Sequence, residues 1–201
     1  MSRVCCFMAE GCEEVEALSV VDVLRRSGIE SLLVSVSDKY EVVSSHNICI
    51  KTDILLEDLD FDTVDMLFLP GGIPGTPNLR ATKVLCDNII KFNEQGKLLA
   101  AVCAAPSIFG ELGILKGKKA TCYPGYENML DGAIVVWDRV VTDGNITTSR
   151  GLGTSLELGF RLVEILKDKQ TADSLKKKVL LFLYRYFLHI NKTEYEINLF
   201  E

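Results

Sequence analysis

Residues 97–109, KLLAAVCAAPSIF, change from a strand pattern to a helix pattern at Cys103. The uninterrupted apolar run 98–102 indicates a strand that is buried on both faces. Small residues and Pro106 follow, and a proline is well tolerated in the first turn of a helix. The segment therefore predicts a strand-to-helix turn with Cys103 at the turn.

Cys103 has two interpretations at this position. Free amide N–H groups and the positive end of the helix dipole favour a thiolate at a helix N-terminus, so the cysteine can be acidic and nucleophilic there. A free cysteine is also often a small buried hydrophobic residue. The segment by itself leaves both interpretations open.

The composition is that of one globular domain. The chain has 201 residues, of which 48% are hydrophobic and 25% charged, and this length supports a single core. We expect one domain over residues 1–201, with 168–201 as a C-terminal helical tail. The net charge of -6 argues against nucleic acid and anionic membranes as partners. The apolar run 180–190 is too short to span a bilayer.

The cysteines indicate free thiols. Seven cysteines, an odd number, show no C-x-x-C pair and no spacing with histidine, so the sequence predicts neither a disulfide framework nor a metal site. The start of the chain shows no secretory signal pattern. We therefore expect a cytoplasmic protein with reduced thiols.

Three predicted strands, 4–8, 64–69 and 98–102, each lead into a distinctive loop. The first loop opens a helix in which Glu16 stacks one turn above the buried stripe, so its carboxyl should point toward the strand ends. Glu13 and Glu14 are expected to be solvated charges of the first turn. The second loop contains Gly71 and Gly72, which allow close backbone approach to a ligand.

Loops that follow parallel strands meet at the carboxyl edge of a sheet, where such folds bind ligands. Glu16, the glycine pair and Cys103 are therefore expected to converge. A thiol, a carboxyl and free amides in one crevice are sufficient for nucleophilic chemistry on a carbonyl. Farther along, 134–137 and 140–142 resemble strands, and Asp143-Gly144 predicts a hairpin, so an antiparallel excursion is expected. Residues 150–155 form a Gly-rich turn before a helix but lack a phosphate-loop signature.

Four motifs in order resemble the ThiJ/PfpI superfamily, and within it the branch of the parkinsonism-associated protein DJ-one. They are GCEEVE at 11–16, LPGG at 69–72, AVCAAP at 101–106 and TSRGLGT at 148–154. The resemblance covers about residues 3–185. It implies an α/β flavodoxin-like (class I glutamine amidotransferase-like) sandwich, with a mostly parallel central sheet and helices on both faces, and a homodimer.

The resemblance also implies roles for individual residues. Cys103 matches the reactive cysteine, and Glu16 matches a protonated acid that hydrogen-bonds to it. Gly72 and Ala104, next to Gly71, match positions whose amides bind an oxyanion. The implied activities use no cofactor: conversion of methylglyoxal to lactate, repair of glycated protein or nucleotide, and peroxide sensing through a cysteine sulfinic acid.

The chain departs from the family pattern at several positions. Family peptidases have His directly after the cysteine, whereas Ala104 stands here, so peptidase activity is not expected. A well-known member of the family has His at the position of Tyr123, Pro at that of Leu152 and Arg near that of His46, so these three residues are expected to reshape the pocket wall and its contact with a second subunit.

Three functional hypotheses remain open at this point. The leading one is a glyoxalase or deglycase that acts on small 2-oxoaldehydes or their adducts through Cys103 and Glu16. The second is an oxidative-stress sensor or redox chaperone in which Cys103 forms a sulfinic acid. The third is a scaffold that has kept the fold and lost turnover.

Overall fold

The computed structural model describes residues 2–181. Within this range one seven-stranded sheet has the strand order β10-β11-β7-β6-β1-β2-β5. Adjacent strands in this sheet are parallel, except that β10 and β11 are antiparallel. The strands are β1 (Arg3–Met8), β2 (Glu30–Ser35), β5 (Ile54–Leu55), β6 (Met66–Leu69), β7 (Leu98–Val102), β10 (Val140–Asp143) and β11 (Ile146–Ser149).

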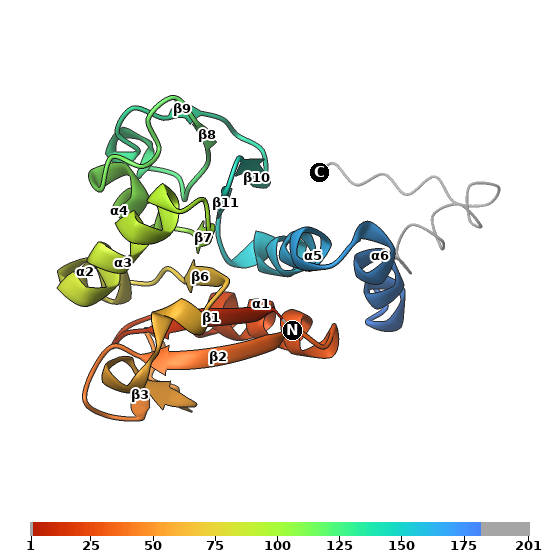
Figure 1. Cartoon of the computed structure of the whole chain (residues 1–201), viewed down its shortest axis with the longest axis horizontal. Coiled ribbons are helices and arrows are strands. Elements are labelled where there is room, and N and C mark those ends of the chain that lie inside the picture. The colour runs from red at the N-terminus through yellow and green to blue at the C-terminus, as the bar shows by residue number, and fades with distance from the viewer. Residues whose placement is uncertain (1, 182–201) are drawn as a thin grey trace, which may run out of the picture.

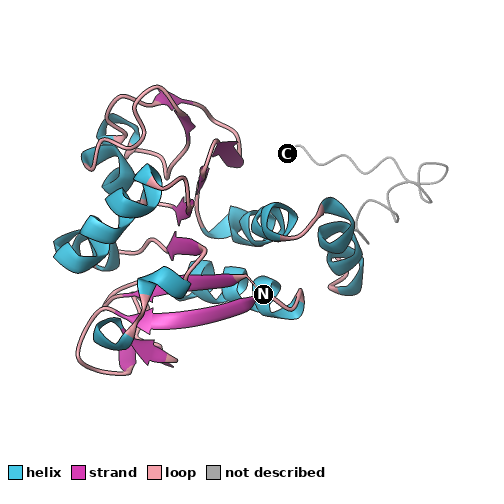
Figure 2. Cartoon of the chain, in the orientation of Figure 1, coloured by secondary structure: helices cyan, strands magenta, loops and turns pink. Residues whose placement is uncertain are grey.

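Helices cover both faces of this sheet, which gives the mostly parallel α/β sandwich that the family resemblance implies. Residues of α1, α5 and α6 pack into one core, and residues of α2, α3 and α4 into the other. Figure 1 shows α5 and α6 on one side and α2, α3 and α4 on the other, with the strands between them in Figure 2. The helices are α1 (Glu14–Arg26), α2 (Gly75–Ala81), α3 (Lys83–Glu94), α4 (Pro106–Glu111), α5 (Ser155–Leu166) and α6 (Lys169–Lys178).

Strand β1 shows why the sheet needs two covering layers. Its side chains alternate between the faces, as successive residues of a strand must. Cys6 and Met8 belong to the core under α1 and α5, whereas Cys5 and Phe7 belong to the opposite core. All four side chains are fully buried. A strand of this kind has no polar face, which explains the continuous apolar run.

The chain order places a switch point beside β1. After β1 the chain adds β2 on one side of this strand, and later it adds β6 and then β7 on the other side. At such a point the loops after neighbouring strands diverge and leave a crevice at the carboxyl edge, which is the usual ligand position of open α/β sheets. The loops after β1, β6 and β7 all lie at this edge.

Two small sheets lie outside the main one. Strands β3 (Glu41–Val43) and β4 (Cys49–Lys51) pair antiparallel, and β8 (Lys119–Ala120) pairs in parallel with β9 (Ile134–Val135). The β10–β11 hairpin agrees with the predicted Asp143-Gly144 turn. The strand expected at 134–137 is present but shorter: it ends at Val135, and Trp137 beyond it is 66% exposed.

The C-terminal part of the chain is described as far as residue 181. Helix α6 packs against α5 and supplies Ala172 and Leu175 to the core. Most of the apolar segment 180–190, for which a terminal helix is predicted, lies outside the described residues. Across 2–181, no helix combines the length and the apolar character that crossing a membrane requires.

Candidate active site

Cys103 lies directly after β7 in a backbone conformation that is unusual for its residue type. Its φ is 64°, in the left-handed region that side chains with a Cβ rarely adopt. Two main-chain hydrogen bonds hold it there: its N–H donates to the carbonyl of Ser149 (3.1 Å), and its carbonyl accepts from the N–H of Tyr123 (2.8 Å). Strained residues persist only where the surroundings over-determine them, and they cluster at functional sites.

Glu16 lies in the first turn of α1 and is 1% exposed. Its Oε2 accepts a hydrogen bond from the N–H of Gly71 over 2.9 Å. The loops after β1 and β6 are also joined directly, because the N–H of Glu13 donates to the carbonyl of Gly71 (2.9 Å). The carboxyl is therefore held in place from the neighbouring loop.

Gly71 is the residue through which the carboxyl and the thiol meet. A Cβ at this position would lie 2.6 Å from Cβ of Cys103 and 2.7 Å from Oε2 of Glu16. Both distances are shorter than real carbon contacts allow, so only glycine lets the three loops close on one another. Glu16 and Cys103 also share a side-chain hydrogen bond. The structure thus brings together the residues that the sequence places on separate loops.

The pKa of Glu16 is raised to about 7. Burial is the largest cause, because it disfavours the charged form, and the nearby carboxylate of Glu13 adds to it. Hydrogen bonds from Cys103 and from the N–H groups of Gly71 and Leu152 oppose the rise. At neutral pH the Glu16 carboxyl can therefore both accept and return a proton.

The pKa of Cys103 is raised to about 12, first by burial and then by the charge and hydrogen bond of the Glu16 carboxylate. The N–H groups of Ala104 and Gly72 lower it, as oxyanion-binding amides would, but they do not outweigh the other causes. This direction is opposite to the acidic thiol that a helix N-terminus predicts. The reason is that burial of the thiol and the neighbouring Glu16 carboxylate outweigh the N-terminus of α4, a helix of only six residues that begins at Pro106.

Glu13 and Glu14 are not the solvated charges that the sequence predicted, because they are only 8% and 6% exposed. Glu13 precedes α1 and caps it, with its Oε2 accepting from the N–H of Glu16 (2.6 Å). Glu14 pairs with His46, whose Nδ1 lies 2.9 Å from Oε1 of Glu14. His46 is 32 positions farther along the chain, so no local pattern could reveal this pair.

The residues predicted for the pocket wall fall in two places. Tyr123 is half exposed, and a Cβ on Gly151 would lie 3.3 Å from its ring and 3.7 Å from Oε1 of Glu16. Leu152 faces Glu16 with its N–H, and its side chain is exposed. His46 lies instead against Glu14 and Ser45. Sequence reasoning had missed Gly151, which has no signal of its own within the Gly-rich turn.

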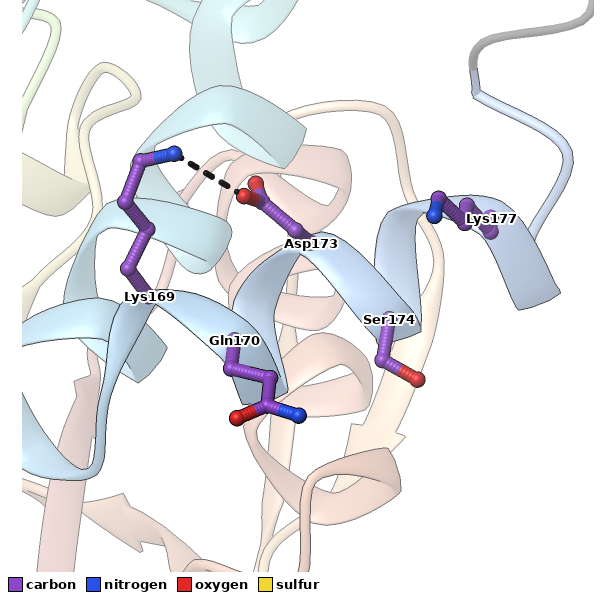
Figure 3. Close-up of a pocket in the computed structure, with 5 residues that line it drawn as sticks. All are labelled: Lys169, Gln170, Asp173, Ser174 and Lys177. Atoms are coloured by element: carbon purple, nitrogen blue, oxygen red, sulfur yellow. Dashed lines mark hydrogen bonds and ion pairs between the residues drawn. The ribbon is translucent and has the colours of Figure 1, made fainter.

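A shallow hollow on α6 lies apart from this constellation. Figure 3 shows five side chains of this one helix around it, with an ion pair between Lys169 and Asp173 (3.1 Å). Neither Cys103 nor Glu16 lines the hollow. It adds no reactive group to Cys103, Glu16 and the loop of Gly71.

An α/β sandwich with a thiol and a buried carboxyl at its switch point defines a class of α/β proteins with a cysteine on a strand-to-helix turn. The chain belongs to the DJ-1/PfpI family, whose pattern matches residues 2–165. It is similar to the Protein DJ-1 homolog B of Arabidopsis thaliana, with 42% identity over 82% of this chain and 38% of that protein. The chain thus spans less than half the length of this relative.

Two further comparisons cover nearly the whole of the related protein. The glutathione-independent glyoxalase DJR-1.2 of Caenorhabditis elegans is 31% identical over 86% of this chain and 92% of its own length. The structure of oxidized DJ-1 from Toxoplasma gondii superposes with a TM-score of 0.86 at 33% identity, covering 90% of this chain and 98% of that one.

Proposed function

We propose that this protein is a cofactor-independent glyoxalase or deglycase that acts on small 2-oxoaldehydes or their adducts. The observation that carries the proposal is the contact of the Cys103 thiol with a buried Glu16 carboxyl whose pKa is about 7. The name of the Caenorhabditis elegans relative, a glutathione-independent glyoxalase, supports the same reaction class. The chemistry requires a nucleophile, a proton carrier and an oxyanion site.

The first step is addition of the thiol to the aldehyde. Sγ of Cys103 forms a bond to the aldehyde carbon while its proton passes to Glu16, because the raised pKa of the thiol rules out a large standing population of thiolate beside an ionised Glu16. The N–H groups of Gly72 and Ala104, which face the sulfur, hold the developing oxyanion. The oxyanion then takes this proton from Glu16, which gives a neutral hemithioacetal and returns Glu16 to the carboxylate form.

The second step moves one proton between adjacent carbons. The Glu16 carboxylate removes the hydrogen of the former aldehyde carbon and returns a proton to the former ketone carbon through an enediol. The product is a thioester of 2-hydroxypropanoate when methylglyoxal is the substrate. Water hydrolyses the thioester, lactate leaves and the thiol is restored, so the sum is methylglyoxal plus water giving lactate. No external oxidant or reductant is needed.

Lactate formation from methylglyoxal by the purified chain tests this proposal. We expect turnover by the unmodified protein, loss of turnover in Cys103→Ser and a strong decrease in Glu16→Gln. Cys49→Ser is the matched control, because Cys49 is exposed on β4 and far along the chain from this constellation. No lactate from the unmodified protein, or equal activity in Cys103→Ser, would sink the proposal.

A second candidate is a peroxide sensor that uses the same sulfur. All seven cysteines are free, but only Cys49, Cys86 and Cys103 are more than marginally exposed. Of these, Cys103 alone has a protonatable carboxyl and two N–H groups beside its sulfur, an arrangement that would stabilise a sulfinic acid. Peptide mass spectrometry after mild peroxide treatment should find oxidation concentrated at Cys103. Equal extents of oxidation at Cys49, Cys86 and Cys103 would count against a dedicated sensor.

We further propose a homodimer in a reducing, cytoplasmic setting. Val15 and Leu18 of α1 and Ile48 of the β3–β4 loop are large hydrophobic residues that are 38% to 49% exposed. A hydrogen bond from the N–H of Ser45 to the carbonyl of Cys12 joins the two segments that carry these residues. Sedimentation of the purified chain should give twice the monomer mass, and a monomer would contradict this part of the proposal.

A further inference from the structure

A second cluster of possible ligand atoms lies at the start of α1, apart from the Cys103 sulfur. Glu13, Glu14 and His46 each offer one carboxylate oxygen or imidazole nitrogen, and these three atoms lie within 4.8 Å of one another. The two carboxylates are almost completely buried, and the imidazole closes the cluster on the solvent side with 66% of its side chain exposed. Two carboxylates and one imidazole therefore face a common point near the surface.

The hydrogen bonds of the cluster leave one acceptor unused. Oε2 of Glu13 accepts from the N–H of Glu16, but Oε1 is buried and has no hydrogen-bond partner within residues 2–181. Only 8% of Glu13 is exposed, so more than nine-tenths of the residue is buried. A carboxylate oxygen that is buried without a partner is costly, and it needs an explanation. Like charge on the adjacent Glu14 adds to the cost.

The backbone fixes the positions of the three residues relative to one another. Glu13 caps α1 and Glu14 is its first residue, so the helix fixes both carboxylates. The loop that carries His46 is tied to the same place, since Ser45 N–H donates to the Cys12 carbonyl (2.8 Å). Ser44 Oγ accepts from the N–H of Ile48 (3.1 Å), which shapes the turn around His46. The donor atoms are thus pre-positioned by three separate constraints.

We propose that Glu13, Glu14 and His46 form a binding site for a divalent transition-metal ion. Oxygen and imidazole ligands suit Mn²⁺, Fe²⁺ and Zn²⁺, and a three-ligand set leaves positions for water. Ligands on one tetrahedral ion at ~2.1 Å stand about 3.4 Å apart, so donors within 4.8 Å need only a small closure, which the exposed His46 side chain can supply. An ion bound through the Glu13 carboxylate, one of whose oxygens has no hydrogen-bond partner within residues 2–181, would offset the two buried charges.

Electron paramagnetic resonance of Mn²⁺ added to the chelator-treated 201-residue chain measures binding and tests the site. Mn²⁺ is chosen because it favours oxygen and nitrogen over thiolate ligands, so free cysteines should compete little. We expect one equivalent of bound Mn²⁺ that Zn²⁺ displaces. His46→Ala and Glu14→Gln should each weaken binding by at least about tenfold, since the loss of a residue that only orients a ligand already costs that much.

Two control variants define the result. Glu41→Gln removes an exposed acid of the neighbouring β3 and should leave binding unchanged. Cys103→Ser should also leave Mn²⁺ binding unchanged, so the measurement tests this site independently of the proposed catalysis. Absence of saturable binding of either ion, binding that His46→Ala and Glu14→Gln leave intact, or equal weakening by Glu41→Gln would each overturn the proposal. Circular dichroism of His46→Ala, an exposed position, shows whether the fold is retained.

Discussion

The N–H of Gly71 donates a hydrogen bond to Oε2 of Glu16 over 2.9 Å, although the two residues are 55 positions apart. This bond fixes the carboxyl that lies against Cys103 and fills one of its acceptor sites. A carboxyl held in this way, buried and close to a second carboxylate on Glu13, keeps a pKa of about 7. The bond thus connects the topology of the sheet to the proton chemistry of the site.

Replacement of Glu16 by Gln should change how stability depends on pH. Folding raises the pKa of Glu16 from 4.5 to about 7, so the native state binds more protons than the unfolded state between these values. Stability therefore falls as the pH rises through this window, by about 3 kcal/mol in full. In urea unfolding, the free energy of unfolding of Glu16→Gln, relative to that of the unmodified protein, should therefore be higher at pH 8 than near pH 4. Glu94→Gln, exposed at the end of α3, should show no such trend.

The same substitution should speed alkylation of Cys103. The Glu16 carboxylate supplies two of the three causes that raise the pKa of this thiol, so its removal lowers that pKa and increases the thiolate fraction. Iodoacetamide labelling at pH 8, followed by peptide mass spectrometry, should be at least about tenfold faster at Cys103 in Glu16→Gln. Labelling of the exposed Cys49 should stay the same. A Cys103 thiol that titrates below pH 7 in the unmodified protein would contradict the raised pKa.

Gly71→Ala should abolish the proposed activity with little loss of the fold elsewhere. The added Cβ would collide with Cβ of Cys103 and Oε2 of Glu16, so the thiol and the carboxyl must separate. We expect a loss of about 100-fold or more in kcat/KM for methylglyoxal, since small displacements of reacting groups cost that much. Gly153→Ala is the control, because a Cβ there meets nothing within 4 Å. Equal activities of the two variants would show that the contact is not needed.

Tyr123→Ala should alter substrate range more than chemistry. The ring lies beside Gly151 and is half exposed, so its removal widens one side of the crevice while the backbone bond to the Cys103 carbonyl remains. We expect kcat/KM for phenylglyoxal to rise relative to that for methylglyoxal. Tyr40→Ala, on an exposed loop, should leave the ratio unchanged. An unchanged ratio in Tyr123→Ala would exclude this ring from the pocket wall.

Local sequence patterns were sufficient for the main elements of the fold. Continuous apolar runs identified β1, β6 and β7, because strands buried on both faces carry no polar positions. Asp143-Gly144 identified the β10–β11 hairpin, because that pair favours the turn. The strand expected at 134–137 is present only at 134–135, and its parallel partner Lys119–Ala120 was not predicted, since no local signal sets that pairing.

The sequence by itself determined the chemistry that is available: one cysteine on a strand-to-helix turn, one glutamate above a buried stripe and a glycine pair after a strand. Only the tertiary structure decided how these groups act on one another. Protonation depends on burial and on charges from distant segments, so the raised pKa of Cys103 and the burial of Glu13 and Glu14 had no signal in the local pattern. The pairing of Glu14 with His46 likewise exists only because the β3–β4 loop folds against the start of α1.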